Sequence, residues 1–142
     1  MSVDWLDEYV EAWVLHPYAG GPEGADALAR LLRCMSADVH YEDVPSGRSW
    51  DGRDGVAKMC NGGYQLSNDL RFTIVTSLTD GRSFAIESLG TGTHTGAFGS
   101  IAATGRPITF RVVSVGDISA DELVSGHRDY WDMADLIRQL QA

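Results

Sequence analysis

Residues 126–140 read GHRDYWDMADLIRQL, and within this stretch the pattern of a strand gives way to the pattern of a helix. Leu123–Trp131 predicts the last strand of the chain, and apolar residues at helical spacing predict a helix over Met133–Leu140. Asp132 stands at the junction between the two. Its carboxylate is expected either to cap the helix or to point into a pocket and transfer protons.

Three further strands are expected between Leu70 and this stretch. Apolar and polar residues alternate from Leu70 onward, and the pair Asp80-Gly81 is typical of a hairpin turn. Residues 82–97 and 106–117 predict two longer strands, and the glycines in the first of them indicate bending or a close approach of the backbone. Strands that follow one another with short turns predict an antiparallel sheet.

Apolar residues at helical spacing predict three helices in the first half of the chain, with one short strand before the third. The expected positions are helices over residues 3–15, 22–35 and 54–66, a strand over Val39–Val44, and a loop over VPSGRSWDG, residues 44–52. Helices that precede an antiparallel sheet define the α+β class. We expect one domain over residues 1–142, in which helices cover a strongly bent sheet and enclose a pocket for a small molecule.

The composition narrows the range of partners. Hydrophobic residues make up 44% of the chain and the formal net charge is −9. Duplex nucleic acid or an anionic bilayer would repel such a chain on average, so neither is an expected partner. The acidic N-terminus lacks the pattern of a signal peptide, which predicts a cytoplasmic protein. The two cysteines form no C-x-x-C pair and the histidines no cluster, so we expect no metal and no other cofactor.

Three segments carry a resemblance to known proteins: GTHTG at residues 92–96, TGRP at 104–107 and HRDYWD at 127–132. With the order of elements along nearly the whole chain, they resemble the SnoaL-like branch of the nuclear-transport-factor-2-like superfamily. The resemblance implies a cone-shaped, mainly antiparallel curved sheet with covering helices and a deep apolar pocket. Members include polyketide cyclases, limonene-type epoxide hydrolases, ketosteroid isomerases and binding proteins without catalysis.

Two segments are also similar to the epoxide hydrolases. Tyr41 and Asp43 fall where those enzymes hold the attacking water with a Tyr and an Asn, and Asp132 falls on their base. Those enzymes also carry an Arg-x-Asp motif, where this sequence has Glu87 and Leu89. The resemblance therefore implies Asp132, Asp43 and Tyr41 as catalytic residues, and it fits the cyclase-like members better than the hydrolases.

Strand alternation divides the last strand into two faces. Arg128, Tyr130 and Asp132 share one face, which we take to be the pocket side because the family places its catalytic carboxylate at Asp132. Asp129 and Trp131 would then point to the opposite face, with Trp131 packed against a helix or a second subunit. An apolar pocket would raise the pKa of the Asp132 carboxyl toward a useful range. The alternative, a carboxylate that only caps the helix, stays open.

In addition to Tyr130, three more residues are expected to contact the substrate. Glu87 lies in the middle of a long strand, where an unpaired buried carboxylate would be costly. We expect it to form an ion pair with Arg111, although a pocket acid is the alternative. Trp13 is expected in the core or in the pocket wall.

These observations predict a cofactor-independent enzyme that acts by general acid/base catalysis on a hydrophobic small molecule. A SnoaL-like cyclase or isomerase is the first hypothesis and an epoxide hydrolase the second. The alternative is a non-catalytic protein that binds a small molecule in the same pocket. We also expect a homodimer formed by the outer face of the sheet, with Trp131 at or near the contact.

Overall fold

The computed structural model describes residues 4–15, 17–18 and 21–141; residue 3, the predicted start of the first helix, lies outside this part. The described chain forms four helices and six strands, in the order α1 (Asp4–Val14), α2 (Gly21–Arg33), β1 (Met35–Asp43), β2 (Arg48–Asp51), α3 (Gly52–Leu66), β3 (Arg71–Thr79), β4 (Ser83–Thr93), β5 (Pro107–Ile118), β6 (Val124–Trp131) and α4 (Met133–Gln141).

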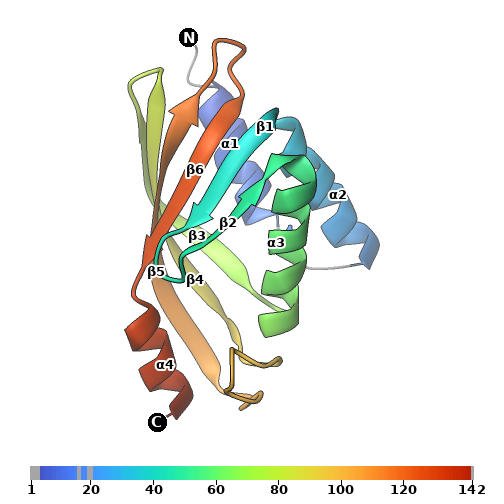
Figure 1. The fold of residues 1–142 in the computed structure, drawn as a ribbon, viewed down its shortest axis with the longest axis vertical. Coiled ribbons are helices and arrows are strands. Elements are labelled where there is room, and N and C mark those ends of the chain that lie inside the picture. Colours follow the sequence, from blue (N-terminus) through green and yellow to red (C-terminus); the bar gives the residue numbers. More distant parts are fainter. Residues whose placement is uncertain (1–3, 16, 19–20, 142) are drawn as a thin grey trace.

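The strands form one sheet in the order β2-β1-β6-β5-β4-β3 (Figure 1). Neighbouring strands are antiparallel, except that β1 and β6 run parallel. The parallel pair brings together segments far apart in the sequence: Tyr41 lies beside His127, and Asp43 lies beside Asp129. The prediction of an α+β fold with a mixed, mainly antiparallel curved sheet is confirmed.

Helices α1, α2 and α3 lie together on one side of the curved sheet, and α4 continues beyond the end of β6 (Figure 1). The main core fills the space between these helices and the sheet, with Tyr9, Leu31, Val39 and Val124 fully buried. A smaller cluster forms where Ile108, Leu136 and Leu140 hold α4 against β5. Burial of apolar area in these clusters is the main favourable term for folding.

Two local predictions in the first half of the chain were wrong. Arg48–Asp51 forms the strand β2, not a loop, because the turn at Pro45–Gly47 folds it back onto β1, with Trp50 beside Tyr41. Its sequence, RSWD, is short and polar and carries no alternation that could be recognised. Met35 begins β1 and does not end a helix; it is fully buried in the core and pairs with Val124.

The GTHTG segment attaches the end of β4 to the end of α3. The Thr95 and Gly96 amides donate to the Leu66 carbonyl at 3.1 and 3.0 Å, which satisfies an otherwise unpaired helix carbonyl. A Cβ at Gly96 would lie 1.6 Å from the Gln65 carbonyl oxygen, so only glycine fits this approach. The buried His94 ring contacts the Thr104 hydroxyl at 2.9 Å.

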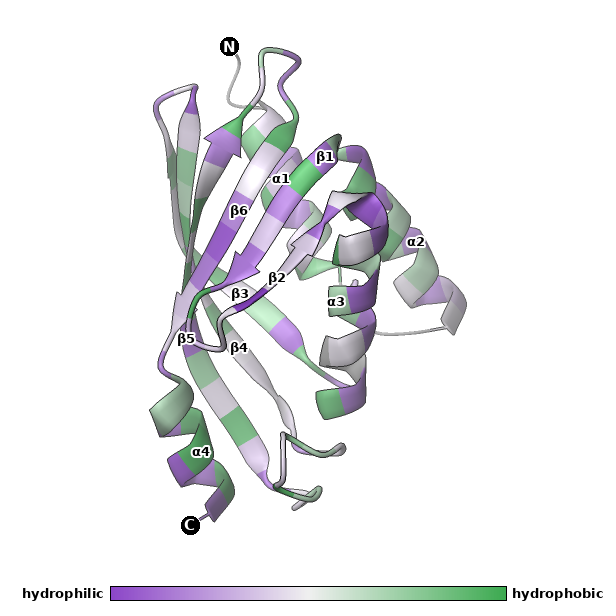
Figure 2. Ribbon diagram, in the orientation of Figure 1, coloured by the Kyte–Doolittle hydropathy of each residue, from purple (hydrophilic) through white to green (hydrophobic). Residues whose placement is uncertain are grey.

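The two faces of the sheet differ in exposure. On β4, Phe84, Ile86 and Ser88 are buried on the inner face. On the outer face four large hydrophobic side chains are at least 41% exposed: Val75, Leu78, Val113 and Tyr130. Figure 2 shows hydrophilic and hydrophobic residues alternating along β5. Among the described residues, no helix is long and apolar enough to cross a membrane.

Candidate active site

A cavity of about 360 Å³ lies between the inner face of the sheet and the helices α1 and α3. Each of the six strands contributes lining residues, and residues 97–99 close part of the wall. Most of the wall is apolar, with Met59, Leu66, Phe72, Ile74 and Phe110 among its side chains. This volume is at the lower end of the range for pockets that bind small molecules.

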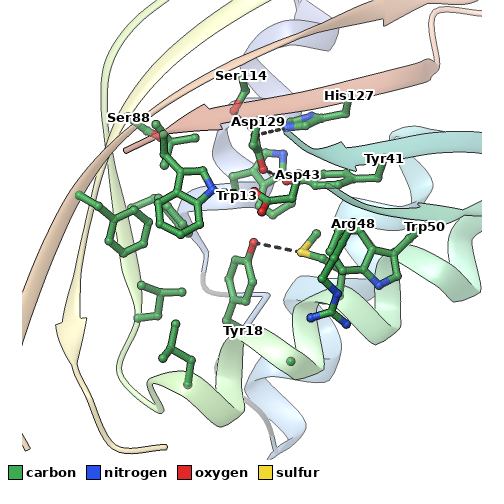
Figure 3. A pocket seen from close by; sticks show the side chains of 18 of the residues that line it. Trp13, Tyr18, Tyr41, Asp43, Arg48, Trp50, Ser88, Ser114, His127 and Asp129 are labelled. Atoms are coloured by element: carbon green, nitrogen blue, oxygen red, sulfur yellow. Dashed lines mark hydrogen bonds and ion pairs between the residues drawn. The ribbon is translucent and has the colours of Figure 1, made fainter. Parts of the chain in front are cut away.

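Asp129 is the central polar group of this cavity (Figure 3). Its Oδ1 accepts hydrogen bonds from Ser114 Oγ at 2.6 Å and from His127 Nε2 at 2.8 Å, and its Oδ2 accepts one from the Tyr41 hydroxyl. The side chain is only 16% exposed. An ionised carboxylate offers about four lone pairs. Three are occupied, so Oδ2 keeps one for a ligand in the cavity.

The His127 side chain is fixed by contacts at both ring nitrogens and on one face of its ring. Its Nδ1 lies 2.6 Å from the Tyr9 hydroxyl and its Nε2 contacts Asp129, while its ring stacks on Tyr41 at 4.4 Å with a 10° angle between the planes. Because the Asp129 carboxylate can only accept, Nε2 carries a proton and donates it. Both ring nitrogens are thus engaged, and His127 orients Asp129.

The surroundings of Asp129 favour its ionised form. Burial alone would raise the pKa of Asp129, but the His127 charge and the hydrogen bonds from His127, Ser114 and Tyr41 outweigh burial and hold this pKa below its usual value. Burial raises the pKa of the Tyr41 and Tyr9 phenols well above the ordinary range, so both remain protonated. The cavity therefore contains a carboxylate that is ionised at neutral pH.

A second carboxylate, Asp43, lines the same cavity. Its Oδ1 accepts a hydrogen bond from Trp131 Nε1 at 2.6 Å, and its Oδ2 accepts one from Ser46 Oγ at 2.5 Å. Tyr41 and Trp13 also line this cavity, and the Trp13 ring lies 5.5 Å from that of His127. Asp43 supports the Trp131 indole.

The predicted orientation of β6 was wrong. Asp132 does not line the cavity: its side chain is 68% exposed, and its Oδ1 accepts a hydrogen bond from the Asp135 amide at 3.0 Å, as a helix cap does. Tyr130 is exposed on the outer face, and Trp131 faces the cavity. The sheet presents His127, Asp129 and Trp131 to its inner side, and Asp132 lies past the end of β6.

Glu87 and Arg111 also lie outside the cavity. Arg111 Nη1 forms an ion pair with Glu87 Oε2 on the outer face, where β4 and β5 pair, so the expected ion pair exists and the expected substrate contacts do not. The inward-facing neighbours on β4 are Ile86 and Ser88. This strand therefore presents no ionisable group to the cavity, in contrast to the Arg-x-Asp of the epoxide hydrolases.

The sequence reasoning missed Asp129, His127 and Ser114 as functional candidates. The sequence did contain a signal for the inner face. Trp131 is the largest side chain of β6 and requires burial, so the residues two and four positions before it, Asp129 and His127, share its inner face. Ser114 is a hydroxyl within an apolar strand, beside Asp129 in the register of β5 and β6. Among the described residues, no group of three or more His, Cys, Asp or Glu side chains is arranged to hold a metal ion.

The chain was compared with known protein families and structures. The model of the SnoaL-like polyketide cyclases matches residues 6–140. No protein with a curated function gave a significant match. Similar solved structures include a candidate SnoaL-like polyketide cyclase from Jannaschia sp. CCS1, with a TM-score of 0.82, 13% identity, and coverage of 99% of this chain and 93% of that chain.

Two other structures have the same fold. TsrD from Streptomyces laurentii has a TM-score of 0.81 and 21% identity, and the match covers 99% of this chain and 97% of that chain. A protein with a ketosteroid isomerase-like fold from Catenulispora acidiphila, in complex with trimethylamine, has a TM-score of 0.75 and 19% identity, with coverage of 94% and 92%. At these identities the structural likeness establishes the fold. The family match over nearly the whole chain establishes that it belongs to the SnoaL-like polyketide cyclase family.

Proposed function

We propose that this protein is a cofactor-independent acid/base enzyme of the cyclase or isomerase type, and that Asp129 is its proton-transfer group. One feature of the cavity supports this proposal. Asp129 is a buried carboxylate in an apolar cavity, held by three donors and left with one free lone pair. A hydrophobic ketone in the cavity would meet this carboxylate through the lone pair that Oδ2 keeps.

The proposed reaction begins with transfer of a proton from a carbon next to a substrate carbonyl to Asp129 Oδ2. The resulting enolate carbon attacks a second carbonyl carbon of the same molecule and forms a carbon–carbon bond. The new alkoxide oxygen then takes the proton back from Asp129 and becomes a hydroxyl, so the enzyme returns to its starting state. An isomerisation would use the same first step and return the proton to a different carbon.

The low pKa of Asp129 restricts the substrate. A weak base removes protons well only from acidic carbons, since proton transfer is most efficient when the two pKa values are close. We therefore propose a carbon flanked by two unsaturated groups, such as two carbonyls or a carbonyl and an aromatic ring. His127, Ser114 and Tyr41 hold the carboxylate in position and donate to it as its charge returns.

The two other hypotheses have less support. Epoxide opening has less support because β4 presents Ile86 and Ser88 to the cavity and no counterpart of the Arg-x-Asp of the epoxide hydrolases. Ligand binding without catalysis would be favoured if the network around Asp129 only stabilises the fold. The same experiment separates this possibility from catalysis.

The test is the exchange of hydrogen for deuterium at C1 of 2-tetralone, a neutral bicyclic ketone whose C1 lies between a carbonyl and an aromatic ring. Wild type should accelerate exchange, and Asp129→Asn should lower the rate by at least about 100-fold. Asp132→Asn is the matched control, because it makes the same change in an exposed carboxylate of the same segment, and it should exchange like wild type. Equal rates for wild type and Asp129→Asn would remove Asp129 from the reaction.

We further propose that the outer face of the sheet joins two copies of the chain. Val113 and Tyr130 are cross-strand partners, and Leu78 lies in the next row of the same face. The charges around them are internally paired, as in Glu87–Arg111, so a second copy would meet an apolar centre with a neutral rim. Sedimentation should give a dimer for wild type and a monomer for Leu78→Asp combined with Val113→Asp; a monomeric wild type would contradict the proposal.

A further inference from the structure

The ionisable groups of the cavity are divided by sign. The carboxylates Asp129 and Asp43 belong to the part of the wall built by β1 and β6, whereas two cations, Arg48 on β2 and Lys58 on α3, complete the lining. Both cations have exposed side chains, so they belong to the rim. Figure 3 shows the Arg48 side chain directed away from Asp129. The sequence contains a single lysine, and it is the one that lines this cavity.

Neither cation has a carboxylate partner among the described residues. Arginines elsewhere in the fold form ion pairs, as Arg30 does with Glu11 and Arg128 with Asp117. The Arg48 guanidinium instead lies over the Trp50 ring, 5.2 Å from its centre, which leaves its N–H donors free. Although Asp43 is the neighbour of Arg48 in the β1–β2 register, its oxygens accept from Trp131 and Ser46.

We infer that Arg48 and Lys58 bind a carboxylate group of the substrate, an inference that rests on the proposed function and specifies its substrate class. An arginine fork and a lysine ammonium are the ordinary ligands of a carboxylate. A substrate anion would be repelled from Asp129 and Asp43 and attracted to this rim. In a chain of net charge −9, such a local positive site is also what an anionic ligand needs in order to approach.

The division of charge gives the substrate one orientation. Its carboxylate lies at the rim, its apolar body contacts Met59 and Phe72, and its reactive carbon reaches Asp129. A neutral ester or amide of the same skeleton would lose the rim contacts while keeping the apolar ones. The substrate class is therefore an amphipathic aromatic or polycyclic ketone that retains a free acid.

The binding test uses the acids benzoate, 2-naphthoate and anthracene-2-carboxylate, each beside its own neutral amide. Trp13, Trp50 and Trp131 line the cavity, so quenching of tryptophan fluorescence reports binding. At low salt the best-fitting acid should bind wild type about fivefold more tightly than its amide. Arg48→Gln combined with Lys58→Gln should abolish this preference without changing amide affinity, and added salt should weaken acid binding only in wild type.

The control is Arg33→Gln combined with Arg82→Gln, because both arginines are exposed, lack an ion-pair partner among the described residues and lie outside the cavity. This variant has the same net charge as the rim variant and should keep the preference for the acid. The inference is overturned if no acid of the series binds wild type more tightly than its amide, or if the control loses the preference as fully as the rim variant. Asp129→Asn should retain the preference, so this result stands apart from any failure of catalysis with the neutral 2-tetralone.

Discussion

Asp129 and Asp132 are three residues apart and have the same side chain, yet the fold gives them opposite environments. Asp129 lies on β6, 16% exposed, and accepts hydrogen bonds from three side chains. Asp132 follows β6, 68% exposed, and accepts a hydrogen bond from one backbone amide at the start of α4. The difference arises because Asp129 lies in the inner row of β6, whereas Asp132 lies past the end of the strand, where α4 begins. A carboxylate thus acquires its chemistry from the face on which it lies.

The largest expected effect on stability is that of Asp129→Ala. This substitution leaves the His127 Nε2–H, the Tyr41 hydroxyl and the Ser114 hydroxyl without their acceptor in a buried site. Losing the partner of buried polar groups costs about 1–3 kcal/mol for each strongly buried group, so the free energy of unfolding should fall by about 3 kcal/mol or more. Urea denaturation measures this change. A loss below about 1 kcal/mol would mean that the network contributes little to folding.

The pH dependence of stability provides a second test of the same carboxylate. Because the pKa of Asp129 is lower in the folded protein than in the unfolded chain, where it is about 3.9, its contribution is complete above about pH 4. That contribution is lost as the pH falls through the lower folded-state value. The stability difference between wild type and Asp129→Asn should therefore stay constant from pH 7 to pH 5 and shrink below pH 4.

Asp69 and Asp80 also have lowered pKa values, because backbone amides donate to them, and they titrate in the same acidic window. Both residues are present in wild type and in Asp129→Asn, so their effects cancel in the difference. A difference that already shrinks between pH 7 and pH 5 would instead mean that the pKa of Asp129 is raised, as an apolar pocket alone would make it.

Much of this fold could be predicted from the sequence, because strands such as β4 and helices such as α1 carry long, regular patterns. The strand β2 could not, because its four residues are positioned by the turn before them and by pairing with Tyr41. The site shows the same limit. Alternation correctly separated residues 128 and 130 from 127, 129 and 131, but the choice of inner face depends on long-range packing against α1. The family resemblance pointed to Asp132, whereas the contacts of His127 with Tyr9 and Tyr41 identify the inner row in the structure.

Two tyrosines allow the same comparison between the buried inner side of the sheet and its exposed outer face. Tyr9→Phe removes the hydroxyl that pairs with His127 Nδ1 at 2.6 Å in a fully buried site, and the unpaired nitrogen should lower the free energy of unfolding by about 2 kcal/mol. Tyr130→Phe makes the same change on the outer face, where the side chain is 45% exposed, and should change stability by less than about 0.5 kcal/mol. Thermal unfolding of both variants, measured at one protein concentration, checks the contrast.

The smallest expected effect is that of Asp132→Asn. Asp132→Ala removes the acceptor of the Asp135 amide and should lower the free energy of unfolding by about 1 kcal/mol, the usual cost of losing an N-cap. Asp132→Asn should cost almost nothing, because asparagine caps a helix about as well as aspartate. The exposed Arg138 guanidinium, 3.9 Å from Asp132 Oδ2, adds little to this difference, since solvent screens such a pair. Urea denaturation of the two variants, combined with their 2-tetralone exchange rates, therefore distinguishes a cap from a catalyst. A cap loses stability only in the alanine variant and keeps exchange in both, whereas loss of exchange in the asparagine variant at unchanged stability would return the catalytic role to Asp132.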